Sequence, residues 1–202
     1  MVLAVFFSAC SGNDSPPGRD AGPDAVTDGA ADSGNGGSLP TTCTGDCQTT
    51  DFAITIDASS ATFERAYFGL TSPAMSERDR WEIYVEASAG GDGLCPTEDS
   101  PTPDRLLILA GLPVPESMAE STDPGLALTF LDFEGSFLSE GPLSRATSIS
   151  VAARAANPCV ECAEGGAAEG ERLIALTIDG SFAEGPGQGR VYATHCDSLD
   201  DL

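Results

Sequence analysis

Short stretches of alternating apolar and polar residues run along the chain from about residue 50 onward. In the first of them Phe52, Ile54 and Ile56 alternate with smaller or polar residues. The same period of two recurs in stretches 81–86, 126–130, 148–151, 174–178 and 191–193. A period of two is typical of strands with one buried and one wet face. The run Leu106–Leu109 is apolar throughout, which predicts a central strand covered on both faces.

Clusters of glycine, proline, aspartate and serine separate these stretches. They lie at residues 72–73, 90–93, 99–104 and 185–189, and such clusters favour turns. Short strands with regular turn signals predict an all-β fold, which we expect to be an antiparallel β-sandwich or, alternatively, a barrel. About eight or nine strands would fill the region 43–202. Residues 61–70 are ambiguous, because their alanine, phenylalanine, glutamate and arginine could also form a short helix.

The N-terminal residues have a different pattern. The apolar run Val2–Phe7 is followed by Ser8, Ala9 and Cys10, and the chain then becomes polar at once. This arrangement resembles the end of a bacterial lipoprotein signal peptide, although Phe7 stands where the family usually has leucine. Residues 1–9 also lack the positive charge of a signal peptide, so we expect the signal to begin upstream of Met1. The alternative is an ordinary apolar N-terminus with a free Cys10.

The resemblance implies a cellular location and a membrane anchor. Cys10 would be the lipidated residue and the mature N-terminus, and the protein would be an outer-membrane lipoprotein of the cell envelope. Two or three acyl chains suffice for stable anchoring. In layout the chain is similar to uncharacterised lipoproteins of myxobacterial type, from which no activity can be carried over.

Residues 10–42 form the predicted tether between this anchor and the folded domain. Asp20, Asp24, Asp28 and Asp32 recur every four residues among glycine, proline and alanine. Like charges at that spacing disfavour a helix, and the composition is that of a self-repelling, disordered spacer.

Six cysteines remain when Cys10 is set aside: Cys43, Cys47, Cys95, Cys159, Cys162 and Cys196. An even number in an exported chain predicts a disulfide framework, but the connectivity of six cysteines is not fixed by sequence. We favour Cys43–Cys47, Cys159–Cys162 and a long-range Cys95–Cys196 bond, the last worth about 4–5 kcal/mol. The alternatives are a zinc site built from the two close pairs and redox chemistry at Cys159 and Cys162. Because export to an oxidising compartment argues for disulfides, we predict no metal and no cofactor.

Charge narrows the range of partners. The 202 residues include 32 acidic and nine basic residues, for a net charge of −23, and all nine basic residues are arginines. Such a field repels phosphate backbones, so nucleic acid is excluded as an expected partner. It equally disfavours direct contact with anionic headgroups, which leaves the lipid anchor as the expected link to the membrane. Calcium remains compatible with so many carboxylates.

Candidate catalytic chemistry is sparse. His195 is the single histidine, no G-x-S-x-G elbow is present, and no glycine-rich phosphate motif precedes a helix. We therefore assign no catalytic residues and expect His195 to be a strand-end histidine beside a disulfide. The Cys95–Cys196 bond would bring the polar loop 99–104 next to the tail 196–201, and that edge is the best candidate for a functional surface.

The sequence thus predicts a lipid-anchored envelope protein, more consistent with a non-enzymatic binding or structural module than with an enzyme. A protein or a glycan would be its partner. The alternatives are a carboxylate-dependent envelope hydrolase and a calcium-dependent adhesion module. A hydrolase should show a cleft with a convergent carboxylate pair of raised pKa, whereas a binding module should show an exposed apolar or aromatic patch.

Overall fold

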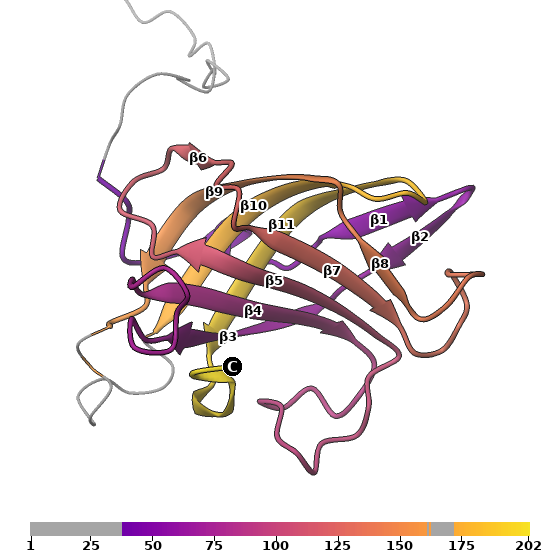
Figure 1. The fold of residues 1–202 in the computed structure, drawn as a ribbon, viewed down its shortest axis with the longest axis horizontal. Helices are drawn as coiled ribbons and strands as arrows, with labels where there is room; N and C mark the ends of the chain where they lie inside the picture. Colours follow the sequence, from indigo (N-terminus) through magenta and orange to yellow (C-terminus); the bar gives the residue numbers. More distant parts are fainter. Residues whose placement is uncertain (1–37, 161, 163–171) are drawn as a thin grey trace, which may run out of the picture. The chain divides into compact units, whose positions relative to one another are not determined.

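Strands dominate the computed structural model, which describes residues 38–160, 162 and 172–202. The described helical segments are two short 3-10 turns, η1 (Gly45–Gln48) and η3 (Asp197–Leu199). Eleven strands are described (Figure 1): β1 (Ala53–Ile56), β2 (Ser59–Thr62), β3 (Arg65–Thr71), β4 (Glu82–Ala89), β5 (Arg105–Pro113), β6 (Glu120–Ser121), β7 (Ala127–Asp132), β8 (Leu143–Arg145), β9 (Ser148–Asn157), β10 (Leu173–Ser181) and β11 (Pro186–His195). The predicted all-β class is confirmed.

All eleven strands belong to one curled sheet. Its order is β6-β9-β10-β11-β3-β4-β5-β7-β8, and β1 with β2 joins at the first half of β11. The sheet is mixed rather than purely antiparallel, because the second half of β11 pairs with β3 in parallel, with Ala193, Thr194 and His195 opposite residues 66–68. In Figure 1, β3, β4, β5 and β7 lie in front of β9, β10 and β11. A single sheet therefore supplies both layers, in the manner of a half-barrel.

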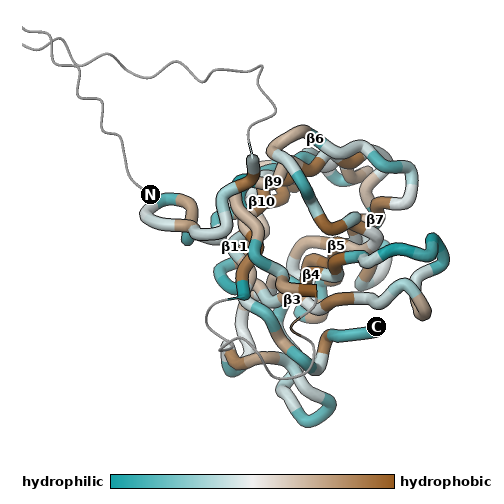
Figure 2. The backbone as a smooth tube through the Cα atoms, turned by 90° about the vertical axis from the view of Figure 1, so that its left-hand side faces the viewer, coloured by the Kyte–Doolittle hydropathy of each residue, from teal (hydrophilic) through white to brown (hydrophobic). Residues whose placement is uncertain are grey.

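The core lies between these two layers. Phe52, Phe63 and Phe130 are buried there. The ring centroid of Phe63 lies 6.0 Å from that of Phe52 and 5.9 Å from that of Phe130. Gly180 of β10 comes so close to Leu128 of β7 that a Cβ atom would crowd it, which ties the back layer to the front. Figure 2 shows the hydrophobic parts of the chain concentrated on the strands. Burial of these side chains is the main stabilising contribution to the fold.

Residues 61–70 form no helix. They make up the end of β2, a short corner and most of β3. Ala66, Phe68 and Leu70 alternate into the core, while Tyr67 lies on the other face. The burial of three apolar side chains at a period of two outweighs the weak helix propensity of the stretch, as tertiary packing commonly does.

Cys10, the signal segment 1–9 and the tether up to residue 37 lie outside the described residues. The last tether residues contact the folded part of the chain: Ser38 forms a β-bridge with Ser117 in the β5–β6 connection, and Pro40 accepts a hydrogen bond from the Ala156 N–H of β9 at 2.9 Å. Contacts with the sheet therefore begin before Cys43. Within the described ranges, no helix has both the length and the apolar character needed to cross a membrane.

Candidate functional site

The six cysteines meet in three pairs. Cys43 and Cys47 lie 5.5 Å apart between Cα atoms, Cys159 and Cys162 5.2 Å, and Cys95 and Cys196 5.7 Å. All three separations are within disulfide range. These are the pairs favoured by the sequence.

The Cys95–Cys196 pair joins the β4–β5 loop (residues 90–104) to the C-terminal tail (residues 196–202). Both segments lie on the same side of the sheet (Figure 1). Pro96 also accepts a hydrogen bond from the Ser198 hydroxyl. Direct contact between the loop and the tail is therefore made at Cys95 and Pro96, a few residues before the stretch 99–104 that the sequence proposed for this edge.

The tail is bound beside the end of β3, beyond the residues that β11 pairs. The Leu70 N–H donates to the Asp200 carboxylate at 2.7 Å, and the Leu70 carbonyl accepts from the Asp201 N–H at 2.9 Å. One step further, the Ser72 N–H donates to the Asp201 carboxylate at 2.8 Å. Donation by the Ser72 N–H lowers the pKa of Asp201. The tail thus satisfies backbone groups that no strand pairs at this edge.

The imidazole ring of His195 contacts two carboxylates of this tail. Its side chain is only 1% exposed; Nδ1 lies 3.2 Å from Asp197 Oδ1 and Nε2 lies 3.0 Å from Asp200 Oδ1. Its ring also packs edge-on against Phe68 at 5.2 Å. The expected strand-end histidine beside a disulfide is confirmed in this geometry. These three side chains come within metal-binding reach of one another, but both ring nitrogens already face carboxylates, and calcium prefers an all-oxygen site.

Gly69 provides the space in which the tail packs. A Cβ atom there would overlap the backbone carbonyl of Leu199. We therefore expect Gly69→Ala to lower the free energy of unfolding by about 1–3 kcal/mol and to speed hydrogen exchange of the Leu70 amide. Urea denaturation and amide exchange measure the two effects. Unchanged exchange at Leu70 would show that the tail is not displaced.

A hollow of about 180 Å³ lies under the β4–β5 loop. Its floor is the outer face of the sheet, with Tyr67 of β3, Glu86 and Ser88 of β4 and Leu106 of β5. In register, Tyr67 stands beside Glu86, and Ser88 beside Leu106. The run 90–93 lets the chain turn back over this floor, because its three glycines adopt positive φ.

Apolar side chains at the rim of the hollow are exposed to solvent. Leu94 is 68% exposed and Phe133 47% exposed. Pro101 and Pro103 add stiff apolar walls, and the Tyr67 hydroxyl fixes the loop by donating to the Gly93 carbonyl at 2.8 Å. The hollow thus combines an apolar rim with a polar floor, the usual composition of a ligand site.

Glu86 is the acidic group on the floor. Burial raises its pKa above the ordinary carboxyl value, while the Tyr84 hydroxyl, donating at 2.8 Å, opposes that rise. Asp92, the other carboxylate that lines the hollow, is exposed on the loop and accepts from the Leu94 N–H at 3.0 Å. Of the two carboxylates that line the hollow, Glu86 alone therefore lies on its floor.

Glu86→Gln is expected to stabilise the protein at neutral pH. Because the pKa of Glu86 is raised in the folded state, its favourable contribution is complete below the ordinary carboxyl pKa and is lost as pH rises through the folded value. Glutamine is neutral throughout, so the gain should be present at pH 7 and absent near pH 3. Thermal melts of both proteins at the two pH values measure this. An equal melting difference at both would contradict the expectation.

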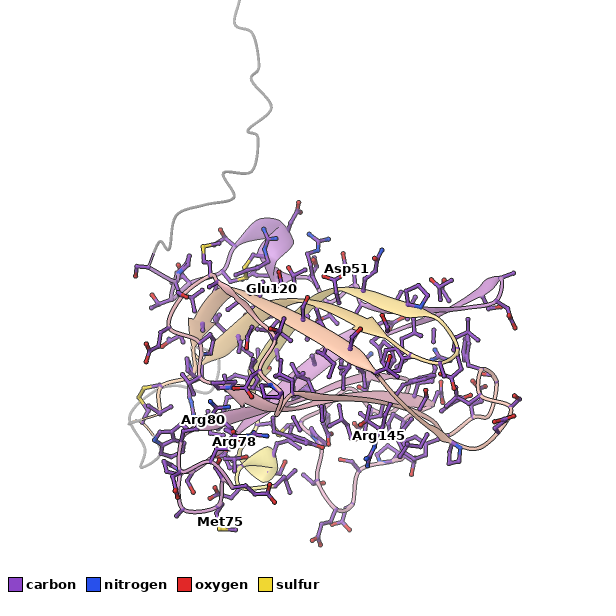
Figure 3. The ribbon with its side chains drawn as sticks, turned by 45° about the horizontal axis from the view of Figure 1, so that its top comes forward. Asp51, Met75, Arg78, Arg80, Glu120 and Arg145 are labelled. Carbon is purple, nitrogen blue, oxygen red and sulfur yellow. A yellow bond between two sulfur atoms is a disulfide. The ribbon has the colours of Figure 1, made fainter. Side chains whose placement is uncertain are left out.

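A separate ion-pair network fixes the other end of β4. Glu82, expected from sequence on a wet face, is buried and accepts from Arg78 at 2.7 Å and Arg80 at 3.2 Å. Arg80 also binds Asp123 at 2.9 Å. Figure 3 shows the two arginines close together near Met75. Since their charges are paired, we assign this network a structural role in holding the β3–β4 connection.

The loop and the tail are predictable from the sequence, but the hollow is not. Glu86 belongs to a stretch that was predicted to be a strand with a wet face, and nothing in its neighbours distinguishes it from other acidic residues. The usable signal was the position of Cys95 within the loop that follows β4, because that cysteine draws the loop back over the strand.

Comparisons with known proteins add no assignment. The chain matches no protein-family model, and no curated protein or solved structure is significantly similar to it.

Proposed function

We propose that this is a lipid-anchored protein of the cell envelope, facing the periplasm or the cell surface, that acts as a non-enzymatic binding module. The hollow beneath the β4–β5 loop is its ligand site. The proposal rests on one observation: the half-buried Glu86 and the exposed side chains of Leu94 and Phe133 line the same hollow. Exposed apolar groups gathered around a cavity usually mark a surface that binds something.

The arrangement of carboxylates favours binding over hydrolysis. A carboxylate-dependent hydrolase needs two carboxyl groups in distinct roles facing one bond. In this hollow the second carboxylate, Asp92, lies on the exposed loop and not on the floor beside Glu86. A calcium-dependent adhesion module is likewise less well supported, since Asp197 and Asp200 both contact the ring of His195.

Binding can be tested with the full chain carrying Cys10→Ser, which removes the lipidation site. An NMR screen with a library of chemically diverse small fragments should shift amides of the β4–β5 loop and of β3 and β4. A Leu94→Ser variant should weaken those shifts, whereas Met75→Ser, which removes an exposed apolar side chain far from the hollow, should not. Fragments that shift only amides elsewhere, or none, would overturn the proposed site.

The anchor is tested separately by expression in a Gram-negative host from an upstream start. We expect an intact mass that corresponds to a chain beginning at Cys10 with added acyl groups, and membrane association that is lost in Cys10→Ser. An unmodified Cys10 in the mature chain would refute the anchor and leave the ligand site unaffected.

A further inference from the structure

We propose that the hollow binds an alkylammonium group, either a lysine side chain of a partner protein or a free aliphatic amine, with the ammonium on Glu86. This inference rests on the proposed ligand site and specifies its ligand. It requires an acceptor for the ammonium, an apolar path for the alkyl chain, and a charge distribution that favours cations.

The acceptor is the Glu86 carboxylate. Across the floor it lies between Tyr67 of β3 and Ile108 of β5. Its described hydrogen bond is the one from the Tyr84 hydroxyl, and within the described residues it forms no ion pair. A carboxylate has about four acceptor positions, so most of its capacity is unused. A half-buried carboxylate without a cation gains from any ammonium that reaches it, because the surroundings screen the charge less than water does.

The apolar path consists of one residue of the floor and the residues of the rim. Leu106 lies on the floor, and Leu94 and Phe133 at the rim. The volume of about 180 Å³ is well below the roughly 300–1,000 Å³ of sites for drug-sized ligands. It suits a short chain with a compact head group better than a whole sugar or nucleotide. Tyr67 and Phe133 also line the hollow, and the faces of aromatic rings attract cations.

The negative charge of the protein also favours a cationic ligand. The guanidinium of Arg65 packs against Gly93 at the edge of the hollow, but Glu86 and Asp92 line the hollow itself. The chain as a whole carries a net charge of −23. A field of this sign raises the local concentration of cations and repels carboxylates and phosphates. An ammonium is a compact point charge on a flexible stem, which fits a narrow hollow closed by a single acceptor.

The test is calorimetric and NMR titration of the full chain carrying Cys10→Ser with n-pentylammonium chloride at constant ionic strength. The neutral probe 1-pentanol tests the alkyl chain alone. Glu86→Gln should weaken pentylammonium binding at least tenfold. The control Glu77→Gln removes the same charge from an exposed position outside the hollow and should have little effect. Binding should also weaken when the pH is lowered enough to protonate Glu86.

Equal binding of pentanol and pentylammonium, or an unchanged affinity in Glu86→Gln, would overturn the inference. If library fragments still shift the hollow amides in that case, the proposed ligand site stands and only its ligand class is wrong. If neither amines nor fragments shift those amides, both proposals fail. A lysine-containing peptide that binds more tightly than pentylammonium would identify a protein lysine as the source of the group. Equal affinity would identify a free amine.

Discussion

Replacing Cys95 and Cys196 together by serine is expected to lower the free energy of unfolding by about 4–5 kcal/mol. The two residues are 101 positions apart in sequence, so the bond removes a long loop from the unfolded ensemble. The estimate follows from the entropy of closing a loop of about 100 residues. Urea denaturation of the oxidised proteins measures the effect. A loss below about 2 kcal/mol would show that the bond contributes little beyond the contacts that surround it.

A matched control is available in the same chain. Cys43 and Cys47 are separated by four positions, and the same loop-entropy relation gives only about 2 kcal/mol for that pair. Cys43→Ser with Cys47→Ser should therefore destabilise the protein clearly less. It should also leave the hollow unchanged, whereas loss of Cys95–Cys196 should release the β4–β5 loop from the tail. Amide shifts of residues 90–104 distinguish the two outcomes.

The fold class could be predicted from local sequence because each long strand is long enough to show the two-residue alternation of apolar and polar side chains. Phe52, Ile54 and Ile56 were expected to face one side together, and all three are buried around β1. The short strands β6 and β8 have two and three residues, too few to establish a period. They pair with β9 and β7, respectively, at the two ends of the strand order.

Two features depend on contacts between distant residues and could not be predicted. The parallel pairing of β11 with β3 joins residues 193–195 to residues 66–68, and no local signal announces a parallel neighbour. The hollow likewise needs the loop 90–104 to fold over Tyr67 and Glu86. That outcome depends on which of several disulfide connectivities forms. Leu106 shows the link: its run was expected to be covered on both faces, but Leu106 and Ile108 are only half-buried on the outer face, where this loop forms the hollow.

The removal of Asp132 should have the next largest effect. Asp132 is 2% exposed at the end of β7 and accepts hydrogen bonds from the N–H groups of Gly135 at 3.1 Å, Phe137 at 2.6 Å and Leu138 at 2.9 Å. Burial by itself would raise the pKa of Asp132, but donation from the backbone N–H groups of Leu138, Phe137, Ser136 and Gly135 lowers it below the ordinary value. The carboxylate therefore folds the turn that carries Phe133 to the rim of the hollow.

We expect Asp132→Ala to lower the free energy of unfolding by about 2–4 kcal/mol at pH 7, because buried N–H donors lose their acceptor. Asp132→Asn should lose less, since one amide oxygen can still accept. With a depressed pKa, the contribution of Asp132 is present above the ordinary carboxyl pKa and is lost as pH falls through the folded value. The gap between wild type and Asp132→Ala in urea denaturation should therefore narrow below about pH 4. A gap of constant size from pH 7 to pH 3 would mean that the turn is held by something other than the charged carboxylate. Phe133 would then owe its position at the hollow to packing alone.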